Sequence, residues 1–151
     1  MQIFILFLVL GLIYYFFKKT NDNKKKRKST LSTAAFDGDR FLVENILDNG
    51  EKIDAQDERG MTALMWAAGN GHSETVTLLL DRGSNINAKN NDGWTALMLA
   101  ASMSKTDTVT ILMNRGANIN AKNADGSTAM MIAGVMGHSE IAEYLRKFAE
   151  K

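Results

Sequence analysis

The chain has 151 residues, of which 45% are hydrophobic, and its lack of cysteine excludes disulfides, zinc–thiolate sites and cysteine nucleophiles. The net charge of +1 is the sum of two oppositely charged segments. Residues 1–28 contain seven basic groups and one acidic group, whereas residues 29–151 contain eleven basic and sixteen acidic groups. This acidic excess argues against a nucleic-acid-binding domain, because binding to phosphates needs clustered Lys and Arg.

The first predicted element is a membrane-spanning helix over residues 1–17. Every residue from Ile3 to Phe17 is apolar, aromatic or glycine, and a helix that is apolar all round favours lipid over the surface of a soluble core. Seventeen residues of helix reach about 25 Å, at the short end of what crosses a hydrocarbon core of about 30 Å. We therefore expect an uncleaved transmembrane anchor.

Residues 18–28 form a predicted basic linker that contains no apolar side chain. Its Lys and Arg residues follow the apolar run directly, so the positive-inside rule predicts that residues 29–151 lie on the cytoplasmic side of the membrane. The expected localisation is that of a single-pass membrane protein. The same basic groups are expected to attract anionic lipid headgroups.

Two alternatives to the anchor remain open. In one, the first segment is a cleaved export signal and the mature protein is soluble. Such a signal carries its positive charge before the apolar run and small residues at the cleavage site, whereas here the charge follows and Phe16, Phe17 and Lys18 make a poor cleavage sequence. In the other, the chain organises membranes mainly through its basic linker.

From residue 29 onward the sequence repeats with a period of 33 residues. The period separates Gly60, Gly93 and Gly126, which begin the sequences GMTALMWAAGNGH, GWTALMLAASMSK and GSTAMMIAGVMGH. A weaker copy precedes these three. The predicted repeat domain spans residues 29–151, with units at about 28–56, 57–89, 90–122 and 123–151.

Each unit has the pattern of two helices joined by a tight turn. Threonines precede the first apolar run, where a hydroxyl can cap a helix, at Thr62, Thr95 and Thr128. A glycine then follows where this helix must end with positive φ, at Gly38, Gly71 and Gly137. Ser104 replaces that glycine in the third unit, and we expect a strained turn there.

This pattern resembles the ankyrin repeat, a 33-residue unit with G-x-T-P-L-H-x-A-A, then G-H, then L-L-L-x-x-G-A-x-x-N-A. The resemblance covers nearly all of residues 28–151 and implies an all-α fold, an ankyrin-repeat solenoid of four helix-turn-helix units, here preceded by one transmembrane helix. In this chain methionine replaces the family's histidine, at Met65, Met98 and Met131. We expect packing to compensate for the hydrogen bonds of that histidine.

No set of residues has the pattern of a catalytic site, and we expect a protein without enzymatic activity, cofactor or metal. The two histidines, His72 and His138, lie at equivalent positions after turn glycines, where we expect a structural role at the start of the second helices. Asp37 and Asp39 flank Gly38 and are interpreted as solvated turn residues.

The resemblance implies a scaffold that binds a partner protein through its loop tips and the inward face of its first helices, without nucleic acid or a small-molecule substrate. Trp94 and the methionines are expected to form an apolar patch with an acidic rim. Trp66, inside a first helix, is expected to pack between units. The candidate partner-binding residues are Arg59, Met61, Asp92, Trp94, Met103, Asp125 and Met136.

Overall fold

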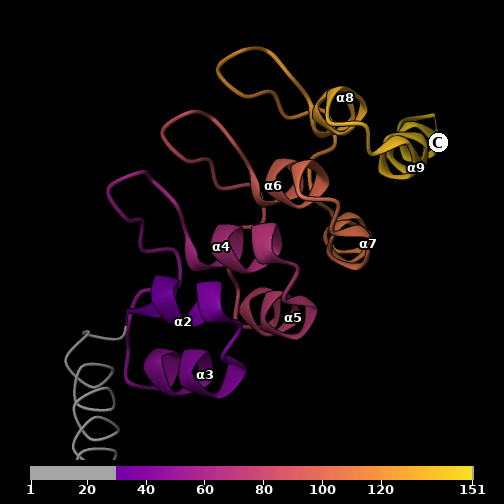
Figure 1. Ribbon diagram of the computed structural model, residues 1–151. Helices are drawn as coiled ribbons and strands as arrows, with labels where there is room; N and C mark the ends of the chain where they lie inside the picture. Colours follow the sequence, from indigo (N-terminus) through magenta and orange to yellow (C-terminus); the bar gives the residue numbers. More distant parts are fainter. Residues whose placement is uncertain (1–29, 151) are drawn as a thin grey trace, which may run out of the picture.

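The computed structural model describes residues 30–150, and these form an all-helical solenoid of stacked helix pairs (Figure 1). This confirms the solenoid expected from the 33-residue period. The predicted transmembrane helix and the basic linker lie outside the described residues. None of the helices within residues 30–150 combines the length and the apolar character that a membrane crossing needs.

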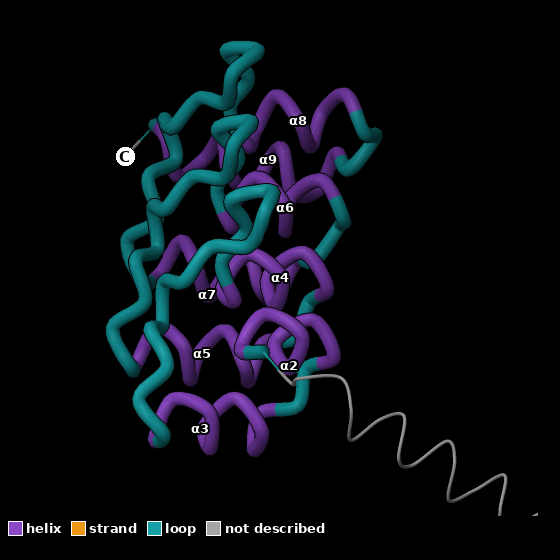
Figure 2. The backbone as a smooth tube through the Cα atoms, turned by 90° about the vertical axis from the view of Figure 1, so that its left-hand side faces the viewer, coloured by secondary structure: helices purple, strands orange, loops and turns teal. Residues whose placement is uncertain are grey.

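Each unit contributes one helix to each of two layers, and the loops between units project from the layer of first helices (Figures 1 and 2). The first helices are α2 (Leu31–Asp37), α4 (Ala63–Asn70), α6 (Ala96–Ser102) and α8 (Ala129–Val135). The second helices are α3 (Arg40–Asp48), α5 (Ser73–Asp81), α7 (Thr106–Asn114) and α9 (Ser139–Ala149).

Threonine hydroxyls begin the first helices, as the sequence predicts. The Thr62 side chain accepts a hydrogen bond from the backbone N–H of Met65 at 3.3 Å, and Thr95 and Thr128 cap α6 and α8 in the same way. Each cap satisfies an N–H group that has no partner within its helix, which stabilises the helix by about 1 kcal/mol.

Small and apolar side chains fill the space between successive first helices. The alanine pairs of α4 and α6 are fully buried, which lets neighbouring helices approach closely. Met65 and Met98 are also buried, so packing does replace the hydrogen bonds of the family's histidine. Met131 is 51% exposed at the equivalent position of α8, because no further first helix packs beside it in the described part of the chain.

The turn after α6 carries the strain expected from the sequence. Ser104 has φ of 56° and is the only non-glycine residue within residues 30–150 with a positive φ. At the equivalent turn after α4, Gly71 has φ of 77°. The left-handed conformation costs a residue with a Cβ about 1 kcal/mol, a cost that glycine avoids.

Replacing Ser104 by glycine is therefore expected to stabilise the repeats by about 0.5–1 kcal/mol. Urea denaturation followed by circular dichroism measures this as a higher midpoint at an unchanged slope. The reverse exchange, Gly71→Ser, is the control and is expected to lower the midpoint. If neither variant shifts it, the turns carry no strain.

The loops between units are joined to one another by hydrogen bonds at the same 33-residue spacing. The Gln56 side-chain amide donates to the Lys89 carbonyl at 2.9 Å, and the Lys89 ammonium group donates to the Lys122 carbonyl at 2.8 Å. Backbone bonds link the tips as well, since the N–H of Asn91 donates to the carbonyl of Arg59 at 3.1 Å. Each loop is thus held in place by its neighbours.

The two histidines tie second helices to the preceding unit. Nε2 of His72 donates to the Phe36 carbonyl at 2.9 Å, and Nε2 of His138 donates to the Ser102 carbonyl at 3.0 Å. His72 and His138 occupy the N-cap positions of α5 and α9. The structural role expected at the start of the second helices is confirmed.

Candidate partner-binding surface

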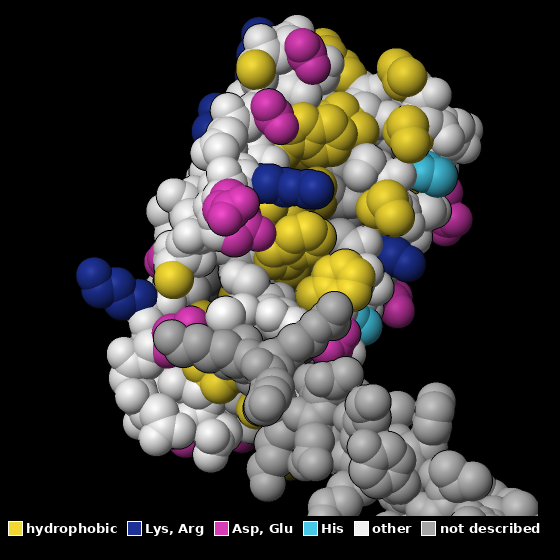
Figure 3. All heavy atoms as spheres, turned by 60° about the vertical axis from the view of Figure 1, so that its left-hand side comes forward, with side chains coloured by type: hydrophobic (Ala, Val, Ile, Leu, Met, Phe, Trp, Pro, Cys, Tyr) yellow, Lys and Arg dark blue, Asp and Glu magenta, His cyan; other side chains and the backbone are white. Residues whose placement is uncertain are grey.

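Apolar side chains gather on the side of the array that the first helices and the bases of the loops share (Figure 3). Phe36, Met103 and Met136 are 48%, 55% and 56% exposed there, far more than apolar side chains of the core. Trp66, Trp94 and Leu99 are partly buried against that core. We call the following residues the inner face: Phe36, Trp66, Trp94, Leu99, Met103 and Met136.

Helical spacing explains why side chains of the inner face line up. Leu99 and Met103 are four residues apart on the first helix of the third unit and so lie on one side of it. Met136 follows Met103 by one 33-residue period and takes the same place in the next unit. The stacked units therefore continue one apolar strip from helix to helix.

Trp66 joins the inner face to the loop beside it. Its ring meets that of Phe36 edge-on, with centroids 5.5 Å apart and an interplanar angle of 76°. The indole N–H donates to Oδ2 of Asp57 at 3.0 Å. Trp66 therefore packs between units, as expected, and an aromatic pair of this geometry contributes about 0.5–1.5 kcal/mol beyond its burial.

A side chain at the start of each loop tip fixes the turn that follows. Oδ1 of Asp57 accepts hydrogen bonds from the backbone N–H groups of Arg59 and Met61, both at 2.9 Å. Oδ1 of Asn90 binds the N–H groups of Asp92 and Trp94 at 3.0 and 2.8 Å. Asn123 repeats this arrangement in the next loop. The tip residues are therefore held in defined positions.

The structure brings most of the candidate residues to this side of the array. Arg59, Asp92 and Asp125 are exposed at equivalent positions of the three loop tips. Met103 and Met136 directly follow the ends of α6 and α8 and are exposed. Trp94, which follows the second loop tip, is partly buried.

Met61 differs from the other candidates because it is only 6% exposed. The Asn90 side-chain amide of the following loop lies 3.4 Å from its sulfur atom. Met61 thus belongs to the core and is not part of the inner face.

Three residues of the inner face, Phe36, Trp66 and Leu99, are absent from the candidates that the sequence supplies. Trp66 lies four residues before Asn70, which takes the same place in the repeat as Met103 and Met136. A spacing of four residues puts two side chains on one side of a helix. This spacing is a signal in the sequence that would have placed Trp66 beside the candidate methionines.

Ion pairs of the described residues lie on the other layer, along the second helices. Arg82 binds Asp48 at 2.7 Å and Glu44 at 3.2 Å, and the hydrogen bond to Asp48 raises the pKa of Arg82. On α9, the hydrogen bond from Arg146 lowers the pKa of Glu143. Within residues 30–150, no ion pair reaches the loop-tip carboxylates, namely Glu58, Asp92 and Asp125.

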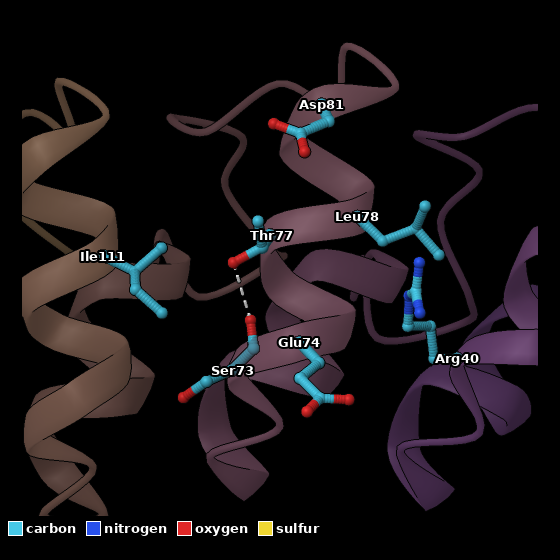
Figure 4. Close-up of a pocket in the computed structure, with 7 residues that line it drawn as sticks. All are labelled: Arg40, Ser73, Glu74, Thr77, Leu78, Asp81 and Ile111. Carbon is cyan, nitrogen blue, oxygen red and sulfur yellow. Dashed lines mark hydrogen bonds between the residues drawn. The ribbon is translucent and has the colours of Figure 1, made fainter.

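A hollow of about 400 Å³ lies along the outer side of α5 (Figure 4). Its lining residues are Arg40, Ser73, Glu74, Thr77, Leu78, Asp81 and Ile111. The Thr77 hydroxyl donates to the Ser73 carbonyl at 2.9 Å, and Asp81 binds Arg115 at 2.8 Å. Figure 4 shows Leu78 and Arg40 on one side of α5 and Ile111 on the other, so these groups do not converge on one point.

The two aspartates that flank Gly38 lie in the turn between α2 and α3. Oδ1 of Asp39 accepts a hydrogen bond from the N–H of Leu42 at 3.0 Å and so caps α3. Asp37 is exposed in the same turn. Among residues 30–150, no cluster of three or more His, Asp or Glu side chains has the arrangement of a metal site.

Comparison with known proteins agrees with the helix pairs and their spacing. A family model described as ankyrin repeats (3 copies) matches residues 31–123 and again residues 89–151. A search of curated proteins finds no match to the chain. The two family matches together run from the first described helix to the end of the chain, and the chain belongs to the ankyrin-repeat family.

Proposed function

We propose that this protein is a membrane-anchored scaffold that displays its ankyrin repeats to the cytoplasm and binds a partner protein through the inner face and the loop tips. Ankyrin repeats are protein-interaction modules and typically have no enzymatic activity. The proposal deepens that general role in two ways, by naming the surface and by attaching it to a membrane.

The exposed inner face is the observation that carries the binding proposal. Phe36, Met103 and Met136 leave about half of their side-chain surface in water, next to two partly buried tryptophans. Contiguous apolar surface of this kind on a soluble domain commonly marks a protein-binding site. Aromatic and methionine side chains inside a charged rim have the composition of an interface centre.

Site-specific photo-crosslinking in cells tests the binding surface. A photoreactive amino acid at position 103 is expected to form a discrete adduct with a partner, whereas the same group at position 140, on α9, is expected to form none. Introducing Trp94→Ala is expected to abolish the adduct, because truncating a central aromatic residue removes about 2 kcal/mol or more of binding energy.

A second variant separates binding from folding in this test. Met103→Glu changes an exposed side chain, so it is expected to leave the helical circular dichroism unchanged while it also abolishes the adduct. Equal adducts from positions 103 and 140, or adducts that survive both substitutions, would contradict the proposed surface.

The amino-terminal sequence supports the membrane part of the proposal. The apolar run ends at Phe17, and seven basic residues follow within residues 18–28. This order of apolar and basic residues is typical of an anchor that keeps the following domain in the cytoplasm. The first described helix, α2, has its N-cap at Thr30, two residues after the last basic residue of this segment.

Membrane extraction and protease protection test the anchor. The native chain is expected to stay with membranes in alkaline carbonate, and its repeats are expected to be protected from protease added to intact cells. Leu6→Lys combined with Leu10→Lys is expected to release the chain, since each charge costs about 3 kcal/mol within a bilayer. A mature chain that lacks residues 1–17, or repeats cut from outside, would favour export instead.

A further inference from the structure

We propose that the partner contacts this protein through a basic amphipathic segment, whose apolar side chains cover the inner face and whose Lys or Arg side chains bind the loop-tip carboxylates. This inference rests on the proposed function and names the chemistry of the partner. It is carried by the charges that the described residues leave unpaired beside the inner face.

Within residues 30–150, ion pairs form only along the second helices, although Asp107 and Glu140 of that layer also lack one. Arg82, Arg115 and Arg146 all form ion pairs along the second helices. On the loop side, the ammonium group of Lys89 donates to a backbone carbonyl of the next loop. Glu58, Asp92 and Asp125 are exposed at the tips and take part in no ion pair with the rest of the described chain.

Exposed methionines and tip aspartates occur together in the third and fourth units. The equivalent tip positions hold Arg59, Asp92 and Asp125 in chain order, so the second and third tips carry a carboxylate where the first carries a guanidinium group beside Glu58. The exposed methionines, Met103 and Met136, are the C-cap residues of the first helices that follow those loops. A segment bound there meets apolar surface along the helices and negative charge along the tips.

Trp94 lies where both kinds of contact meet. It is two residues from Asp92, and one Asn90 carboxamide oxygen binds the backbone N–H groups of both residues. A cation held by Asp92 can also approach an indole, and such contacts contribute about 0.5–2 kcal/mol. The first tip holds both Glu58 and Arg59, so it attracts a cation less than the tips of Asp92 and Asp125, and the bound segment has a preferred direction.

The same charges disfavour other binding partners at this surface. An anionic membrane, a nucleic acid or an acidic peptide would face the unpaired carboxylates of the tips, and like charges brought together across an interface oppose binding. A basic segment gains attraction at the tips in addition to the burial of its apolar side chains.

Selection from a random peptide display library tests the inference. The bait is the full chain in nanodiscs of zwitterionic lipid, and peptides that also bind the Met103→Glu variant are discarded. The retained peptides are expected to combine Leu, Met, Phe or Trp with an excess of Lys and Arg. If the retained peptides are neutral or acidic, this inference is wrong but the proposed binding surface still stands. If every selected peptide also binds the Met103→Glu variant, both the inference and the proposed binding surface are wrong.

Charge reversal at the loop tips measures how much the tip carboxylates contribute to peptide affinity. The double variant Asp92→Lys, Asp125→Lys is expected to bind a retained peptide with about tenfold lower affinity. The salt dependence of this affinity, measured by fluorescence anisotropy, is also expected to fall. Asp107→Lys with Glu140→Lys makes the same change of net charge on the second helices and is expected to have little effect. If both double variants lose the same amount of peptide affinity, the loop-tip carboxylates are not the groups that bind the basic side chains.

The chain's own basic linker needs a separate control, because residues 18–28 have the same charge as the proposed partner. Replacing the linker Lys and Arg residues by Gln is expected to leave peptide affinity unchanged. A tighter peptide complex after this change would mean that the linker itself occupies the surface, and it would overturn the proposal of a separate partner.

Discussion

Replacing Gly60 by alanine is expected to destabilise the repeats by roughly 3 kcal/mol. Gly60 has φ of 75°, a conformation that opposes a Cβ. A Cβ at this position would also lie 2.5 Å from Oδ1 of Asn91 and 2.8 Å from its backbone N. The side chain can move, but the backbone N is held by its hydrogen bond to the Arg59 carbonyl. Urea denaturation measures the loss.

Gly83→Ala is the matched control for this variant. Gly83 has φ of 89°, and a Cβ there would find no atom within 4 Å. Gly83→Ala is therefore expected to lower the free energy of unfolding by about 1–2 kcal/mol, which is the cost of the left-handed backbone conformation alone. The difference between the two variants measures how closely successive loops approach at Gly60, and equal losses would contradict that contact.

The second large effect is expected from Leu97→Ala, with a loss of about 3 kcal/mol in the free energy of unfolding. Leu97 is 1% exposed on α6, which packs between α4 and α8. Removing its side chain leaves a cavity between units that are too short to fold alone, so the loss reaches beyond one helix pair.

Val135→Ala serves as the control for Leu97→Ala because the Val135 side chain is 88% exposed on α8. Its truncation is expected to change stability by less than about 0.5 kcal/mol. The comparison uses the midpoint and slope of urea denaturation. Losses of equal size would mean that the packing between first helices is not the main source of stability.

Local chemistry explains why the fold could be predicted from the sequence. A threonine before an apolar run and a glycine after it determine where each first helix begins and ends, as Thr62 and Gly71 do for α4. These signals act within a few residues, and the threonine recurs in all four units and the glycine in three of them. Ser104 fits the same logic, since its place in the repeat predicts the positive φ that the structure has.

The surface was harder to predict because exposure depends on neighbouring units. Met61 and Trp94 are one period apart in the repeat, yet Met61 is buried and Trp94 is partly exposed. Asn90 of the following loop contacts the sulfur of Met61, and such contacts do not follow from the position within a unit. Trp66 shows the same limit, since one indole both packs against Phe36 of the preceding unit and forms part of the inner face.

The bonds that join successive loops also determine how the protein responds to force. Among the described residues, the bonds that Gln56, Lys89 and the tip backbones make between loops reach no further than the adjacent loop, so the contacts that resist extension act in series. Tension applied at Thr30 would reach α2 and α3 first and would peel the units away in chain order. Trp94, Met103 and Met136 lie in the later units, and a pulled molecule would keep this part of its surface intact after its first unit has opened.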